Sequence, residues 1–536
     1  FEENDSRAIL YVYSFISGAD WADEVARIDR MSKITKQDVV EWANKYLGPE
    51  SYAIIYKREG KDPDEQKIAA PKITPIVTNR DSQSEFLSEI QTSQVQPIEP
   101  VFVDYKKDMS QFEAQPGIDV LYKKNETNDI FTLIYVFNTG TENDPALNLA
   151  FNYLSYLGTD KMTAEEIASE MYDIACSFYM NAGANQSSIQ ITGLSENMGK
   201  AMEIVEGLIA GAKPDEAILE NLKGDMLKSR ADAKLNQSRC FGALQRYLFY
   251  GGDFIRRTTL TDPALQALTS EQLLAKIGGL MGKQHEVLYY GPQKETEIKS
   301  ALAEHHKVAA DLQPLEKKFS ALLPTDANKV VLAQYDAKQL YYLQFSNRGE
   351  KFDVAADPEI TLYNEYFGGG MNTIVFQEMR EARGLAYSAW ATLATPSNAN
   401  GDYSYYAFIA TQNDKMQKAV EAFDDIINNM PESEKAFGIA KEALVSRLRT
   451  ERTVKDGVLW SYLRARDLGL DAPRDKQIFE KVQSMTLDDV KAAQQKWVKG
   501  RKYVYGILGD IQDLDLNYLK TLGPIQTVSQ EEIFGY

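Results

Sequence analysis

The feature that most constrains the fold is a pattern that occurs three times, without gaps, in the 536-residue chain. Each copy has apolar residues four and one positions before a threonine, a polar amide or acid three positions after it and an aliphatic residue four positions after it. The threonines are Thr35, Thr269 and Thr486. Such a pattern predicts a helix whose first turn is capped by the threonine hydroxyl. A run of β-branched and aromatic residues then predicts a short buried strand at 53–56, 287–290 and 504–507.

The spacing of the three copies predicts the size of a repeated domain. The threonines lie 234 and 217 positions apart, so one domain has about 220 to 230 residues and ends with this helix and strand. Only 34 residues precede Thr35. We therefore expect Phe1 to lie inside a domain of which about 180 residues are outside this sequence.

The rest of the chain divides by composition. Residues 1–60 carry the first copy, and residues 61–110 are rich in Pro, Ser, Gln and charge, which predicts a linker. Residues 111–310 and 311–536 each mix strands with long helices. Strands are expected at 119–122, 131–137, 340–345 and 403–411, and helices at 201–212, 215–236, 359–367, 415–429 and 432–452. This mixture predicts an α+β fold of two-layer sandwich domains with mainly antiparallel sheets.

Charge and composition exclude several classes of function. The chain has 59 Lys and Arg against 78 Asp and Glu, a net charge of −19, which disfavours nucleic acid as a partner. Apolar runs are too short to predict a membrane span. The two cysteines, Cys176 and Cys240, are too few for a disulfide scaffold or a thiolate metal site. An acidic chain of this kind suits the cytoplasm and the periplasm equally, so its localisation stays open.

Histidine, the usual zinc ligand and general base, is rare in this chain, which contains only His285, His305 and His306. No two of them have the i, i+4 spacing that places a pair of zinc ligands on one face of a helix. We expect all three to be solvated surface residues, with His285 at an exposed strand start. The same shortage argues against a serine or cysteine nucleophile, which needs a base.

One segment has the character of a functional site. A glycine turn at 368–370 leads into an expected helix that begins at Asn372 or Thr373 and ends at Gly384, before a strand at 385–390. Arg380 and Tyr387 then lie on either side of a helix-to-strand corner, where a guanidinium and a phenol could both stabilise negative charge on a carbonyl oxygen. Alternatively, Arg380 pairs with a nearby carboxylate and Tyr387 belongs to the core. The residues alone leave both interpretations open.

At this segment the sequence resembles the pitrilysin and insulinase-like zinc metallopeptidases, the inverzincins. The resemblance rests on the string Arg380-Glu381-Ala382-Arg383-Gly384-Leu385-Ala386-Tyr387 after a glycine turn and a helix. It implies two halves, each of two α+β domains, that are joined by a linker and close around a peptide. On this basis 1–60 is the end of the second domain, 61–110 the linker between halves, 111–310 the third domain and 311–536 the fourth.

The resemblance also implies that the third domain is a metal-free copy of the catalytic domain. The family motif H-x-x-E-H has its counterpart at 149–153, where Leu149 and Tyr153 replace the histidines and Asn152 replaces the glutamate that acts as general base. None of these side chains can hold zinc or accept a proton from its water. Zinc is therefore expected in the first domain, outside this sequence, and none is expected on this chain.

The implied function is that of the C-terminal half of a zinc endopeptidase. Arg380 and Tyr387 would bind the peptide substrate and stabilise the transition state across from the metal, and the chain alone would be inactive. Its partner would be the N-terminal catalytic half or a catalytic subunit. Two alternatives stay open: a non-catalytic scaffold subunit that pairs with an active peptidase, and an inactive relative of the whole enzyme.

Overall fold

The computed structural model describes residues 3–57, 60 and 84–536, in two compact units, Phe1–Gln94 and Val95–Tyr536. The first unit is helical in its described part. Its helices are α1 (Asn4–Ser17), α2 (Trp21–Val25), α3 (Arg27–Met31), α4 (Lys36–Tyr46) and α5 (Glu85–Thr92). Residues 61–83 of the expected linker lie outside the described residues.

The first copy of the repeat forms its helix but not its strand. Thr35 caps α4, and Asp38 completes a reciprocal capping box by accepting from the Thr35 backbone N–H at 2.8 Å. The strand predicted at 53–56 is wrong, because residues 52–57 belong to no strand. A strand needs a neighbour to bond its backbone groups, and Ile55 is instead 91% exposed. The first copy of the repeat therefore has the sequence of a strand, but the described residues supply no neighbouring strand for it to pair with.

The second unit contains two open six-stranded sheets. The first has the order β1-β2-β6-β3-β5-β4 and the second the order β12-β7-β11-β8-β10-β9. The strands of the first sheet are β1 (Ser110–Gln115), β2 (Ile118–Lys124), β3 (Ile130–Phe137), β4 (Cys176–Ala182), β5 (Ser187–Leu194) and β6 (His285–Gly291). Those of the second are β7 (Lys329–Gln334), β8 (Gln339–Lys351), β9 (Ser388–Ala394), β10 (Asp402–Gln412), β11 (Val504–Gly509) and β12 (Ile525–Val528).

The other two copies of the repeat occupy equivalent places in these sheets. Strand β6 lies between β2, which is parallel to it, and β3, which is antiparallel. Strand β11 likewise lies between the parallel β7 and the antiparallel β8. The preceding helices, α12 (Ser270–Met281) and α20 (Leu487–Ala493), both start at the predicted threonine with a capping box.

Most helices pack on one face of the sheet that is formed by the same part of the chain, with α10 (Gln237–Thr258) and α18 (Gly457–Asp467) as exceptions. The helices of the first half are α6 (Leu147–Leu154), α7 (Ala164–Asp173), α8 (Met198–Gly211), α9 (Glu216–Lys234), α10, α11 (Asp262–Ala267), α12 and α13 (Glu295–His305). Those of the second are α14 (Asp357–Phe367), α15 (Ile374–Phe376), α16 (Met416–Asn428), α17 (Glu434–Thr450), α18, α19 (Arg474–Val482), α20, α21 (Leu516–Leu522) and α22 (Gln530–Phe534). The predicted α+β fold with mainly antiparallel sheets is confirmed.

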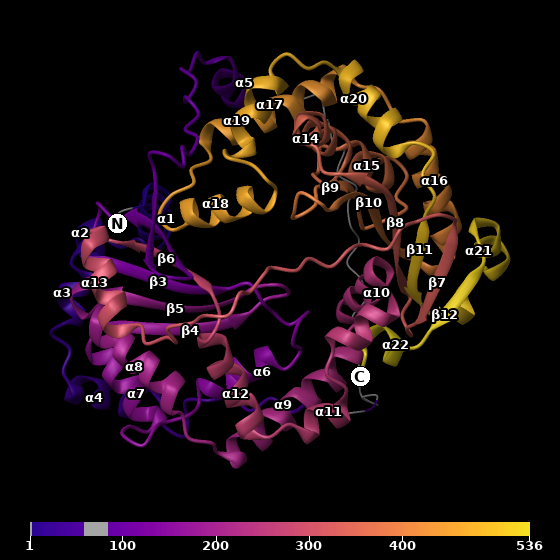
Figure 1. Cartoon of the computed structure of the whole chain (residues 1–536). Coiled ribbons are helices and arrows are strands. Elements are labelled where there is room, and N and C mark those ends of the chain that lie inside the picture. Colours follow the sequence, from indigo (N-terminus) through magenta and orange to yellow (C-terminus); the bar gives the residue numbers. More distant parts are fainter. Residues whose placement is uncertain (1–2, 58–59, 61–83) are drawn as a thin grey trace. The chain divides into compact units, whose positions relative to one another are not determined.

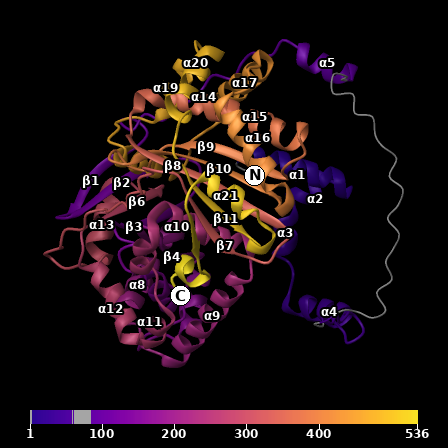
Figure 2. The ribbon, with the colours of Figure 1, turned by 90° about the vertical axis from the view of Figure 1, so that its right-hand side faces the viewer.

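The opposite face of each sheet is covered by a helix from the part of the chain that forms the other sheet. Leu244 and Leu248 of α10 pack with Leu343 and Leu508 of the second sheet, and Figures 1 and 2 show α10 beside β11 and α22. In return, α18 packs its apolar side on the first sheet (Figure 1), where Leu459 joins a cluster with Ile134 and Leu288. Alternate residues of β3 therefore face different helices, and the central strands are almost wholly apolar because both faces are covered.

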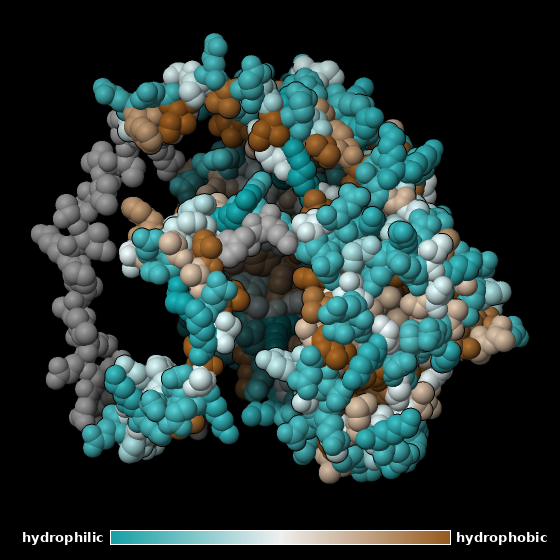
Figure 3. Space-filling view, turned by 90° about the vertical axis from the view of Figure 1, so that its left-hand side faces the viewer, coloured by the Kyte–Doolittle hydropathy of each residue, from teal (hydrophilic) through white to brown (hydrophobic). Residues whose placement is uncertain are grey.

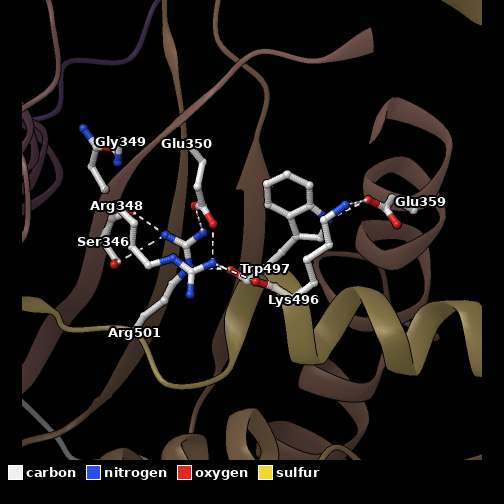
Figure 4. A network of polar contacts seen from close by, with 9 residues as sticks. Ser346, Arg348, Gly349, Glu350, Glu359, Lys496, Trp497 and Arg501 are labelled. Carbon is white, nitrogen blue, oxygen red and sulfur yellow. Dashed lines mark hydrogen bonds and ion pairs between the residues drawn. The ribbon is translucent and has the colours of Figure 1, made fainter. Parts of the chain in front are cut away.

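A network of ion pairs and hydrogen bonds around one buried arginine joins the second sheet to the helical segment that precedes β11 (Figure 4). The side chain of Arg501 is completely buried, and its Nη2 lies 2.6 Å from Oε2 of Glu350 on β8. Glu359 of α14 accepts from the Trp497 indole N–H at 2.8 Å and from the Lys496 ammonium at 2.7 Å. Buried charges must be paired in this way, so the network fixes one arrangement of these elements.

The described helices include none with the length and apolarity needed to cross a bilayer. The face drawn in Figure 3 is mainly hydrophilic, and its hydrophobic residues form small separate patches.

Candidate functional site

The glycine turn before the candidate site is required by a close backbone approach at one position. The Gly368 carbonyl accepts from Ala391 N–H at 3.0 Å, and Asn364 bonds both backbone groups of Leu393 at 2.9 Å. A Cβ on Gly368 would meet the Ala391 oxygen at 2.4 Å, whereas one on Gly369 would meet nothing within 4 Å. These bonds also close part of the free edge of β9, the outermost strand of its sheet.

The helix after this turn is not a regular α-helix. Thr373, in an extended conformation, precedes α15, and the chain then continues as a π-helix, η3 (Gln377–Ala382). Gly384 ends the segment with φ of +56°, a left-handed conformation that favours glycine. The strand begins at Ser388, later than the expected residue 385. Wide turns of the π type recur at functional sites in proteins.

Arg380 and Tyr387 meet across this corner. The guanidinium carbon of Arg380 lies 4.7 Å from the centre of the Tyr387 ring and 5.0 Å from the centre of the Phe376 ring. Both are cation–π distances. The Arg380 side chain is 39% exposed and Tyr387 is 74% exposed. The stacking orders two side chains that remain accessible to a ligand.

The interpretation of Tyr387 as a core residue is wrong, because the ring is exposed. In the described part of the chain, the carboxylate that lies beside Arg380 is that of its neighbour Glu381, whose Oε1 is 3.7 Å from Arg380 Nε. Arg383 differs: its Nη2 lies 3.2 Å from Asp425 and 3.4 Å from Glu378. Of the two arginines on this turn, Arg383 serves the ion pairs that hold the segment, and Arg380 faces the pocket.

A pocket of about 470 Å³ opens beside the two side chains. Its wall combines the corner with the ends of β8 and β10. The lining residues are Lys338, Gln339, Arg380, Gly384, Leu385, Ala386, Tyr387, Ala410, Thr411, Gln412 and Lys415. A guanidinium and a phenol at such a surface can both donate hydrogen bonds to a carbonyl oxygen and stabilise negative charge on it.

The counterpart of the metal motif is part of the core. Leu149 and Tyr153 on α6 are buried, and the Tyr153 hydroxyl bonds Ser270 Oγ at 2.7 Å and the Asp215 backbone N–H at 2.7 Å. Asn152 is exposed. The described residues contain no group of three His, Cys, Asp or Glu side chains that could hold a metal ion. These residues therefore do not fit a zinc site.

The expectation for the histidines is wrong for His285 and His306, which are buried. Their Nε2 atoms lie 2.8 Å apart, and His306 Nδ1 lies 2.5 Å from Glu206 Oε1 on α8. Burial, and next the nearby His306, lower the pKa of His285 to about 4. The repeat predicts an exposed His285 because Ser51 and Lys502, which occupy the same position in the other two copies, are exposed. The available signal was Glu206, a charged residue within an apolar stretch of helix.

Comparison with known proteins identifies similar sequences. The model of the peptidase M16 inactive domain matches residues 285–444. The chain is 23% identical over 266 residues to an uncharacterized zinc protease of Streptomyces coelicolor, a match that covers 46% of this chain and 56% of that protein. The chain thus spans little more than half the length of this relative.

Solved structures show the same fold at low identity. The peptidase M16 inactive domain from Pseudomonas fluorescens superposes with a TM-score of 0.59 at 18% identity, covering 75% of this chain and 98% of that one. The periplasmic protease PqqL from Escherichia coli gives a TM-score of 0.58 at 12% identity, covering 90% of this chain and 52% of PqqL.

Proposed function

We propose that this chain, whose residues 285–444 match the inactive domain of the M16 peptidases, forms the half of a zinc-dependent endopeptidase that does not bind the metal. In this proposal Arg380 and Tyr387 bind the backbone of a peptide and stabilise the oxyanion that develops at the scissile carbonyl. The observation that carries the proposal is the stack of these two exposed side chains at the edge of the pocket. Donors held in advance toward developing charge are the largest single source of rate enhancement in many enzymes.

The catalytic metal would come from the domain or subunit with which this chain pairs. A zinc ion there would supply a water that is activated for attack at neutral pH. This chain would contribute two hydrogen-bond donors, the Arg380 guanidinium and the Tyr387 hydroxyl, together with the pocket residues around them.

We further propose that the segment 53–56 takes part in the pairing. Ile55 is 91% exposed, whereas its repeat equivalent Tyr289 is fully buried at the centre of a sheet. Strands β6 and β11 each lie between one parallel and one antiparallel neighbour. A partner that offers two such strands would bury Ile55 and bond its backbone. Changing Ile55 to Lys should then weaken association with the catalytic partner, as measured by analytical ultracentrifugation.

The variant Arg380→Lys tests the proposed role in the assembled enzyme. Lysine keeps the charge but loses the planar group that stacks on Tyr387. We expect kcat to fall by about tenfold to a hundredfold while the zinc content stays unchanged. A scaffold subunit without a catalytic role predicts normal turnover in this variant, and that result would reject the proposal in favour of the scaffold.

A further inference from the structure

The pocket beside Tyr387 has a basic lining in an acidic protein. The chain as a whole has 78 Asp and Glu against 59 Lys and Arg. The pocket lining contains three basic residues, Lys338, Arg380 and Lys415, and no acidic residue. We propose that this pocket binds a carboxylate of the peptide, either an acidic side chain or the C-terminal carboxylate. The proposal rests on the proposed function, because it assigns the pocket to the same substrate.

Two of the three basic residues are brought together by one buried asparagine. Asn413 Nδ2 donates to the Ala337 carbonyl at 2.8 Å, and the Asn413 backbone N–H donates to the Lys338 carbonyl at 3.3 Å. Asn413 is itself only 8% exposed. The turn before β8 is therefore fastened to the start of the turn Asn413–Lys415, so that Lys338 and Lys415 line one side of the pocket.

Hydrogen bonds also hold the part of the pocket lining that contains Leu385 and Ala410. Thr411, which is buried, donates from Oγ1 to the Leu385 carbonyl at 2.5 Å. Tyr387 N–H donates to the Ala410 carbonyl at 3.2 Å. These bonds attach the corner to the end of β10. The pocket thus combines apolar lining residues with three cations, an arrangement that suits the apolar stem and the carboxylate of an acidic side chain.

The carboxylates already near the basic residues leave room for a ligand. Lys338 Nζ lies 3.4 Å from Asp513 Oδ2, and the lysine side chain is 91% exposed. Arg380 Nε lies 3.7 Å from Glu381 Oε1. Exposed pairs at such distances are weak and screened by solvent, so a ligand carboxylate that reaches several cations at once can compete with them.

Peptide titration of this chain tests the proposal. The probes are N-acetylated hexapeptides: one pair differs by an internal Glu or Gln with an amidated C-terminus, and the other, without acidic side chains, differs by a free or amidated C-terminus. We expect at least about tenfold tighter binding of the carboxylate member in one pair, as a charge-assisted contact implies. The pair that responds identifies the source of the carboxylate.

The control separates a local contact from the general field. The double variant Lys338→Gln/Lys415→Gln should remove the preference, while Lys228→Gln/Lys520→Gln, two exposed lysines outside the pocket lining, should retain it at the same net charge. Equal binding within both peptide pairs would overturn the proposal, as would equal loss in both double variants. Either result would leave the role of Arg380 and Tyr387 in turnover untouched, because that role is measured by kcat.

Discussion

The guanidinium carbon of Arg380 lies 4.7 Å from the centre of the Tyr387 ring, across the corner that Gly384 makes. This contact joins the end of a π-helix to the residue before an edge strand. A planar cation stacked on a ring loses little freedom when it binds a ligand, so the two donors are ordered before a peptide arrives.

Substitution of Gly368 should disturb the corner, whereas substitution of Gly369 should not. The added methyl group of Gly368→Ala would meet the Ala391 oxygen at 2.4 Å and the Asn364 oxygen at 2.8 Å. Overpacking against backbone costs about 1 to 3 kcal/mol, because the backbone must shift. Gly369→Ala is the matched control, since it points into open space. Urea unfolding of both variants should separate them, and equal midpoints would contradict this view of the turn.

Loss of Arg466 should weaken the packing of α18 on the first sheet. Its Nη2 lies 2.8 Å from Glu286 Oε2, and the Glu286 side chain is only 10% exposed. Arg466→Met would leave that carboxylate without its cation, at a cost of about 1 to 3 kcal/mol. Arg464→Met removes an exposed arginine from the same helix and should cost less than about 0.5 kcal/mol. Thermal unfolding compares the two variants, and equal melting temperatures would exclude a stabilising role for the pair.

His285 should make the protein less stable in acid. Its pKa in the folded chain is about 4, below the ordinary value of 6.5, so the unfolded chain binds the proton more readily. The stability contributed by neutral His285 is complete above about pH 6.5 and is lost as the pH falls toward 4, by roughly 3 kcal/mol in total. Below pH 4 this residue adds no further loss.

The variant His285→Gln isolates this contribution. The free energy of unfolding, measured with urea at pH 7 and pH 4.5, should fall less in the variant than in the native protein. The neighbouring groups His306 and Glu206 are present in both proteins, so the substitution removes the His285 imidazole alone. Identical pH dependence in the two proteins would show that His285 is not held neutral by its surroundings.

The sequence predicted those parts of the fold that depend on local patterns. Thr269 and Thr486 cap helices because a hydroxyl and an acid or amide three residues later satisfy backbone groups without distant partners. The strands β6 and β11 were predictable because their residues are suited to a buried strand. The corner at Gly384 was likewise foreseen, although the π-helix and the later start of β9 were not.

Features that depend on distant partners were missed. The strand expected at 53–56 has the right residues, but a strand exists only with a neighbour. The place of His285 was set by Glu206 and His306, which no repeat position encodes. The exchange of α10 and α18 was also not predicted, because an apolar helix face does not specify which sheet will cover it.

The variant Tyr387→Phe tests the central claim most directly. It removes one hydroxyl from an exposed ring and keeps the stack on Arg380, so the fold and the zinc content of the assembled enzyme should be unchanged. The measurement is kcat for peptide hydrolysis with the catalytic partner present. We expect kcat to fall by about tenfold to a thousandfold, as the loss of a donor to the transition state implies. An unaltered kcat would contradict the role assigned to Tyr387.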